Sequence, residues 1–166
     1  LLEIIDAPNF IIDNWGLTSI GKTTVMSIAA SVWGLPIKEQ GGIILPWDAT
    51  KVAIERLATF FNHLAIFLDD SQTANERIVK DILYMIANGG GRSRGAIKGS
   101  QKTSFWRTIA FSTGEQPLNQ VTEFEGAKAR IISLYGSPFG EKKQAELIHK
   151  VKPAINSNYG HAGPRF

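Results

Sequence analysis

Short apolar runs alternate along the chain with longer stretches in which apolar residues recur every three or four positions. The runs indicate β-strands, and the periodic stretches indicate helices that bury one face. Leu64–Leu68 is apolar throughout, which is typical of a parallel strand buried on both faces. The pattern predicts strands at 10–12, 43–45, 64–68, 108–112 and 130–134, with helices at 25–33, 51–61, 74–87 and 141–151.

Capping residues and glycines set the expected ends of these helices. Thr50 is a suitable N-cap, and Gly34 with Pro36 ends the first helix in the usual order. The glycines after Asn88 end the third helix and open a flexible loop. The positions expected to face inward are Val25, Ile28, Ala29, Val32 and Trp33, then Ala53, Leu57, Phe60 and Phe61, then Ile78, Ile82, Met85 and Ile86.

The alternation of strands and helices predicts an α/β fold, in which a mainly parallel sheet has helices on both faces. Ligands of such sheets bind beyond the carboxyl ends of the strands. The length of 166 residues suits one domain, and a composition of 43% apolar and 20% charged residues suffices for a core. The chain begins without Met and within an element, so we expect residues 1–166 to be a single domain from a longer protein.

Composition excludes several classes of protein. The chain has no cysteine, so it has no disulfide, no thiolate metal site and no catalytic cysteine. This fits a reducing compartment, and we expect the cytoplasm. No apolar run approaches the roughly 20 residues that span a bilayer, so we expect no membrane association.

Residues 16–23, GLTSIGKT, match the pattern G-x-x-x-x-G-K-[ST] between a predicted strand and a predicted helix. The glycines let the backbone turn tightly and bring N–H groups to phosphate oxygens. Lys22 would reach the β- and γ-phosphates, and the Thr23 hydroxyl would bind Mg²⁺. The sequence therefore predicts a P-loop that binds a nucleoside triphosphate with magnesium, ATP by analogy, through Gly16, Ser19, Gly21, Lys22, Thr23 and Thr24.

A P-loop needs an acidic residue on another strand to hold the metal and its water shell. Asp69 ends the apolar strand at 64–68 and is the predicted magnesium residue. Asp70 follows directly, where many ATPases carry the acid that polarises the attacking water. The alternative is that the two aspartates cap the helix that begins nearby.

Polar residues also end the predicted strand at 108–112. Ring-type ATPases place there a side chain that senses the γ-phosphate, and Ser112 or Thr113 suits this role. Glu115 would add a second carboxylate. Ordinary turn chemistry of serine, threonine and glycine is the alternative explanation.

Arg130 stands at the start of the last predicted strand. A cation there could act as an arginine finger on a γ-phosphate, in cis or across a subunit boundary. Lys128 is a weaker rival, and a surface arginine beside a strand is the alternative.

A local excess of basic residues lies between Ile82 and Gly114, a window without Asp or Glu in a chain of net charge +3. Such a window favours an anionic partner. Arg92, Arg94 and Lys98 are the predicted DNA contacts, with Phe105 or Trp106 stacking on bases. A lid over the nucleotide or a plain surface loop are the alternatives.

Several ordered strings together resemble one family, the phage and integrative-element P-loop ATPases called domain of unknown function 927, which are similar to superfamily-three helicases. The strings are GLTSIGKTTVMSIAASVWG, PWDAT, LAIFLDDSQ, ILYMIANGGGRSRG, FWRTIAFSTGE, GAKARIISL and NYGHAG. The resemblance implies a RecA-like or AAA-like core that works as a homo-oligomeric ring on DNA. It also implies nucleotide binding by Lys22 and Thr23, metal binding by Asp69 and water activation by Asp70, although the family more commonly carries Asp-Glu there.

The favoured function is a DNA-directed ATPase motor, a helicase or translocase that replicates a phage or mobile element. A small-molecule kinase with a basic lid is one alternative. A nucleotide-dependent assembly module that hardly hydrolyses is another. A GTPase is disfavoured because the chain has no N-K-x-D motif.

Overall fold

The computed structural model describes residues 2, 4–91, 94–96, 99–101, 104–140 and 144–165. The strands are β1 (Phe10–Trp15), β2 (Ile44–Pro46), β3 (Ala65–Asp69), β4 (Arg94–Ala96), β5 (Gly99–Gln101), β6 (Ile109–Gly114) and β7 (Ile131–Tyr135). The α-helices are α1 (Lys22–Ser31), α2 (Lys51–Phe60), α3 (Glu76–Asn88), α4 (Leu118–Val121), α5 (Glu125–Lys128) and α6 (Gln144–Ser157), and short 3₁₀ turns lie at Ser71–Thr73 and Gly163–Arg165.

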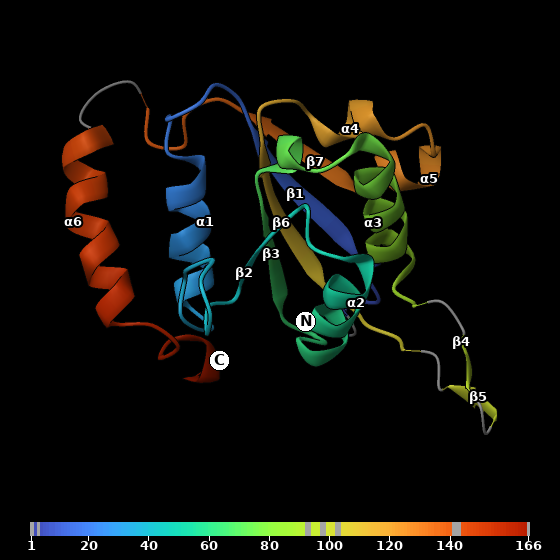
Figure 1. Ribbon diagram of the computed structural model, residues 1–166. Coiled ribbons are helices and arrows are strands. Elements are labelled where there is room, and N and C mark those ends of the chain that lie inside the picture. The colour runs from blue at the N-terminus through green and yellow to red at the C-terminus, as the bar shows by residue number, and fades with distance from the viewer. Residues whose placement is uncertain are drawn as a thin grey trace.

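A five-stranded sheet in the order β2-β3-β6-β1-β7 forms the centre of the fold, and all its pairs are parallel. Helices α1 and α6 lie on one side of the sheet, and α2 and α3 lie on the other (Figure 1). The predicted α/β fold is therefore confirmed. Because β6 lies between β1 and β3, the carboxyl ends of these three strands are neighbours.

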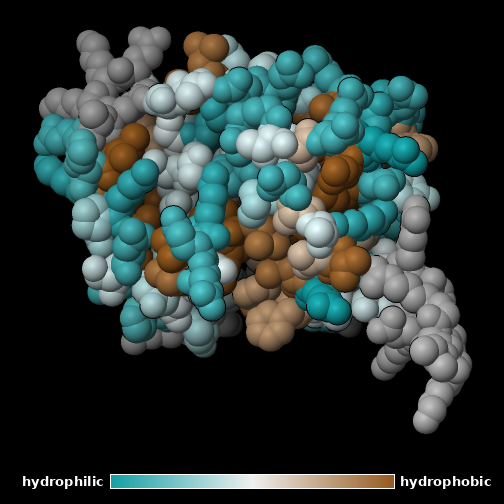
Figure 2. Space-filling view, viewed as in Figure 1, coloured by the Kyte–Doolittle hydropathy of each residue, from teal (hydrophilic) through white to brown (hydrophobic). Residues whose placement is uncertain are grey.

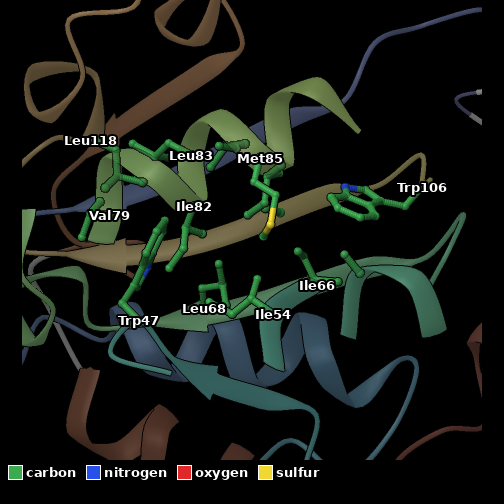
Figure 3. Close-up of a cluster of buried hydrophobic side chains, with 14 residues drawn as sticks. Trp47, Ile54, Ile66, Leu68, Val79, Ile82, Leu83, Met85, Trp106 and Leu118 are labelled. Atoms are coloured by element: carbon green, nitrogen blue, oxygen red, sulfur yellow. The ribbon is translucent and has the colours of Figure 1, made fainter. Parts of the chain in front are cut away.

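Two clusters of buried apolar side chains hold the layers together. The larger lies between the sheet and the pair α2 and α3, and Figure 3 shows Trp47, Ile82 and Leu68 meeting within it. The smaller packs α1 onto the other face through Met26 and Phe67. Each large side chain buried in this way contributes roughly 1.5–3 kcal/mol. Strand β3 supplies both clusters, as its continuous apolar run predicted.

Capping contacts place the start of α2 and the end of α3 close to the predicted positions, whereas α6 runs through Pro153 to Ser157, beyond the predicted end at 151. The Thr50 hydroxyl accepts a hydrogen bond from the Ala53 N–H at 3.2 Å, so the predicted N-cap of α2 is confirmed. Gly89 closes α3 with φ 67°, and its N–H bonds to Met85 O at 3.2 Å. A Cβ on Gly89 would lie 2.5 Å from Asn9 Nδ2, so only glycine fits this turn.

Several predicted inward positions are wrong. Phe60 is 82% exposed and Ile78 41% exposed, because α2 turns Ile54 and Ala58 inward and α3 turns Val79 and Ile82 inward. Figure 2 shows apolar surface exposed in several places on one face of the protein, interspersed with hydrophilic side chains. In α1 the fully buried apolar positions are likewise not the predicted ones but Met26 and Ala30.

The segment after α3 also differs from the expected flexible loop. Strands β4 and β5 pair as an antiparallel hairpin that extends away from the sheet (Figure 1). The chain returns to the body of the protein through a bridge between Gly90 and Phe105. In the part of the chain that the structure describes, no helix is long and apolar enough to cross a membrane.

Candidate nucleotide site

The loop between β1 and α1 takes the conformation that its glycines allow. Gly16 has φ 148° and Gly21 has φ 95°, both values that disfavour other residues. A Cβ on Gly21 would lie 2.8 Å from the Phe139 ring, so close packing also requires glycine there. Ser19 has a positive φ of 64° without being glycine, which adds local strain to the loop.

Lys22 is 9% exposed and folds back over this loop. Its ammonium donates hydrogen bonds to Gly16 O at 2.9 Å and to Leu17 O at 2.6 Å. The two carbonyl oxygens provide hydrogen-bond acceptors for the nearly buried ammonium of Lys22. Phosphate oxygens would be stronger acceptors and would compete with these carbonyls for the ammonium.

Asp69 is the meeting point of the site. Asp69 is the last residue of β3, and it is 1% exposed. Oδ1 accepts hydrogen bonds from the Thr23 hydroxyl at 3.1 Å and from the Thr113 hydroxyl, and Oδ2 forms an ion pair with Lys38. The strand order explains this convergence, because β6 carries Thr113 into the space between the P-loop strand and β3.

Asp70 occupies a strained position beside Asp69. Its φ is 70°, in the left-handed region, and its N–H donates to the Thr113 hydroxyl at 3.1 Å. Burial raises the pKa of the Asp70 carboxyl, and the negative charges of Asp69 and Glu115 raise it further, against the lowering effect of Lys38 and Lys22. The carboxylate is thereby a better proton acceptor than an ordinary aspartate.

Ser112 points away from the nucleotide side, although it was predicted as a sensor beside Thr113. Its hydroxyl accepts a hydrogen bond from Trp47 Nε1 at 3.1 Å within the larger apolar cluster. Neighbouring residues of a strand face opposite sides of the sheet, so only one of the two can face Asp69. The geometry therefore favours Thr113.

Asp13 is a buried carboxyl on the same side of the sheet as Ser112. Its Oδ2 accepts from the Leu118 N–H at 2.8 Å and from the Ser133 hydroxyl at 3.4 Å. Burial raises the pKa of Asp13 to about 6, although hydrogen bonds from Leu118, Ser112 and Ser133 act in the lowering direction. This residue ties β1 to the start of α4 and lies outside the nucleotide site.

A cavity of about 560 Å³ lies over the carboxyl ends of the strands. Glu115 lines it and accepts a hydrogen bond from the Thr18 hydroxyl of the P-loop. Sequence reasoning missed several of the lining residues because no motif marks them. The cavity is lined by Thr18, Ser19, Gly21, Lys22, Thr23, Thr24, Lys38, Asp69, Asp70, Gln72, Thr113, Glu115, Ile148 and Lys152.

The oxygen donors of this cavity fit a magnesium ion. The Thr23 hydroxyl and the Asp69 carboxylate lie 3.1 Å apart at its floor. Magnesium is usually held by one or two protein oxygens together with water and substrate phosphates. Among the described residues no group of three or more His, Asp or Glu side chains is placed to hold a metal alone. A metal here would therefore be shared with the phosphates.

Arg130 lies at the opposite end of the sheet. It precedes β7, whose Ile131 pairs with Ile11 near the start of β1, whereas the P-loop follows the end of β1. Its Nη1 donates to Ala87 O at 2.5 Å, and it lines a separate cavity with Arg107. This separation argues against the predicted action in cis, whereas action across a subunit boundary stays a prediction.

The predicted DNA contacts are largely beyond what the structure describes. Arg92 and Lys98 lie outside the described residues. The Arg94 backbone pairs with Gln101 in the hairpin of β4 and β5. At the base of this hairpin Phe105 is 71% exposed, whereas Trp106 is buried in the core. Phe105 is therefore the accessible aromatic of the two.

Comparison with known proteins places the chain in a family. Residues 1–106 match the family described as Domain of unknown function (DUF927). The chain belongs to the DUF927 family. No curated protein matches it. Among solved structures it is similar to "SCCmec type IV Cch - active helicase", with a TM-score of 0.77 and 25% sequence identity. That match covers 99% of this chain and 30% of the helicase chain, which supports a helicase-like relationship for this DUF927 domain.

Proposed function

We propose that this DUF927 domain is an ATP-binding and hydrolysing motor that acts on DNA as a helicase or translocase. The observation that carries the proposal is the convergence on Asp69 of Thr23, from the P-loop helix, and Thr113, from the strand between them. In this arrangement the γ-phosphate would lie between a metal-binding pair and a polar sensor. Phosphoryl transfer depends mainly on positioning and charge neutralisation, so such a set suffices for hydrolysis.

Each residue would have a distinct task. The Lys22 ammonium would give up its hydrogen bonds to the loop carbonyls and donate to the β- and γ-phosphates instead. Thr23 and Asp69 would hold magnesium, which when bound would neutralise charge on the phosphate oxygens. Asp70, with its raised pKa, would accept a proton from the attacking water. Thr113 would report loss of the γ-phosphate, since its hydroxyl joins both aspartates.

A finger role for Arg130 would require a homo-oligomeric assembly, because this residue lies at the opposite end of the sheet from the P-loop of its own chain. A head-to-tail interface joins two different surfaces of the same chain, so an arginine on one surface could meet a P-loop on the other. An arginine finger supplied in trans is worth about 10³-fold or more in turnover. We therefore propose that the nucleotide site is completed by Arg130 of a neighbouring copy.

Action on DNA is supported by likeness and by charge. The similar solved structure is named a helicase. The acid-free window from Ile82 to Gly114 includes the hairpin and its exposed Phe105. Surfaces that bind single-stranded DNA usually combine basic residues, which contact the phosphate backbone, with aromatic side chains, on which the bases stack.

The test is phosphate release from the purified protein, with and without single-stranded DNA. We expect DNA to raise turnover, and Lys22→Ala and Asp69→Asn each to abolish the stimulated rate. ATP loss that needs an added acceptor and releases no phosphate would instead indicate a kinase. Nucleotide-dependent assembly without turnover would indicate an assembly module.

A further inference from the structure

We propose that Lys38 is a nucleotide-binding residue whose ammonium alternates between Asp69 and the terminal phosphate. This inference rests on the proposed function, since it concerns the same site. In the structure the Lys38 ammonium pairs with Asp69 Oδ2. When magnesium and ATP bind, the metal would take over Asp69, and the ammonium would move to the γ-phosphate.

The ion pair joins two very different partners. The Asp69 carboxylate is 1% exposed and fixed by the end of β3, whereas the Lys38 side chain is 44% exposed. Lys38 stands in the connection between α1 and β2, outside any regular element. Its long flexible stem can therefore move while the aspartate stays in place.

Charge balance explains why Asp69 needs a cation. A buried carboxylate without a counter-charge is strongly disfavoured. Lys22, the lysine of the P-loop itself, donates its hydrogen bonds to Gly16 O and Leu17 O instead. Within the described residues Lys38 is therefore the side chain that neutralises Asp69.

Magnesium and Lys38 compete for one carboxylate. Oδ1 accepts from the Thr113 hydroxyl and, at 3.1 Å, from the Thr23 hydroxyl, whereas Oδ2 is paired with Lys38 and lies 3.4 Å from the same Thr23 hydroxyl. A divalent cation bound beside Thr23 and Asp69 would repel the ammonium. The nearest new acceptors in the same cavity would be the phosphate oxygens, which form strong charge-assisted hydrogen bonds with lysine.

The exchange has two measurable consequences. Lys38 should weaken metal binding, because the ion must displace it. It should also favour ATP over ADP, because only ATP offers a γ-phosphate to the released ammonium. Removal of the charge should therefore lower the magnesium requirement and weaken the preference for ATP at the same time.

The experiment is equilibrium binding of fluorescent methylanthraniloyl ATP and ADP to the purified protein across a magnesium titration. For Lys38→Gln we expect the half-saturating magnesium concentration to fall about threefold or more. We expect the preference for ATP over ADP to fall about tenfold, the worth of one charge-assisted hydrogen bond. Lys38→Arg should restore the ATP preference.

Lys150→Gln is the matched control, because Lys150 is exposed on α6 and pairs with Glu146 at 2.7 Å, away from the cavity. It should behave as wild type, and thermal melts should show that each variant is folded. A higher magnesium requirement in Lys38→Gln would overturn the inference, because Lys38 would then merely support Asp69. Unchanged values would overturn it as well. Failure of the wild-type chain to bind either nucleotide, or binding unaffected by Lys22→Ala, would instead refute the proposed function and Lys38's role with it.

Discussion

The distance between Arg130 and the P-loop makes catalysis across a subunit boundary testable by mixing two inactive variants. Lys22→Ala removes the phosphate-binding ammonium but keeps Arg130. Arg130→Ala keeps the P-loop but removes the finger. If Arg130 serves a neighbouring copy, a Lys22→Ala subunit can complete the site of an adjacent Arg130→Ala subunit. If it served its own chain, no mixture could contain a working site.

The expected rate follows from the geometry. From Ile11, which pairs with Ile131, to the P-loop is a run of about five residues, or roughly 16 Å at the rise of a strand. That exceeds the reach of an arginine side chain, so Arg130 would have to act on another chain. Loss of a finger in trans should lower the turnover of Arg130→Ala about 10³-fold, and Lys22→Ala should be inactive because it lacks the phosphate-binding ammonium. In a random equal mixture about half of the P-loops are intact and about half of the neighbouring fingers are, so the mixture should recover about one quarter of the wild-type rate.

The assay is steady-state phosphate release at constant total protein while the ratio of the two variants is varied. Activity should peak near an equal mixture and vanish at both ends. Light scattering should show that each variant still assembles with wild type, and Lys150→Gln mixed with wild type should leave the rate unchanged. A flat, inactive mixture of variants that do assemble would refute the reasoning, as would full activity of Arg130→Ala.

Three other predictions concern buried or strained polar groups. If Asp70 accepts the proton, turnover should fall as pH drops through a pKa above the usual aspartate value of 3.8, and Asp70→Asn should remove that acid limb from the pH–rate profile. Burial raises the pKa of Asp13 from 3.8 to about 6 in the folded protein. The free energy of unfolding should therefore fall as pH rises from about 4 to about 6, by about 3 kcal/mol in all, and should not fall further above that range because of this group. Asp13→Asn, which keeps an acceptor for the Leu118 N–H, should therefore raise the urea midpoint at pH 7.5 and leave it nearly unchanged at pH 4; a stabilisation equal at both pH values would contradict this account. Thr113→Val should reduce turnover at least tenfold with little change in ATP binding, because it removes one hydrogen-bond donor from Asp69 and one acceptor from the Asp70 N–H; a loss of binding alone would argue against a sensor.

Local signals in the sequence predicted the framework of the site. The P-loop pattern and the apolar run before Asp69 depend on neighbouring residues alone, and both lie where they were expected. The choice between Ser112 and Thr113 depends on which face of β6 meets the P-loop, and periodicity in one strand leaves that open. The placement of Arg130 needed the strand order, which brings the start of β7 beside the start of β1.

Other features could not be predicted from the sequence because they depend on contacts between distant segments of the chain. Lys38 belongs to no motif, and its role appears only where the α1–β2 connection passes Asp69. Phe60 was placed in the core because it is apolar, but the phase of α2 is set by Ile54 and Ala58 against the sheet. The hairpin of β4 and β5 lacks the apolar alternation that identifies strands, since its residues include glycine, serine and arginine.

The central position of β6 has a consequence for how this domain can be divided. The family match ends at residue 106, before β6 begins at Ile109. A piece cut there would lose the strand that separates β1 from β3, and both would present unpaired N–H and C=O groups at new edges. Such edges attract other chains, so the shorter piece should aggregate when expressed alone. The smallest useful recombinant unit must therefore extend at least through β7, even though the strongest motifs end at Asp70.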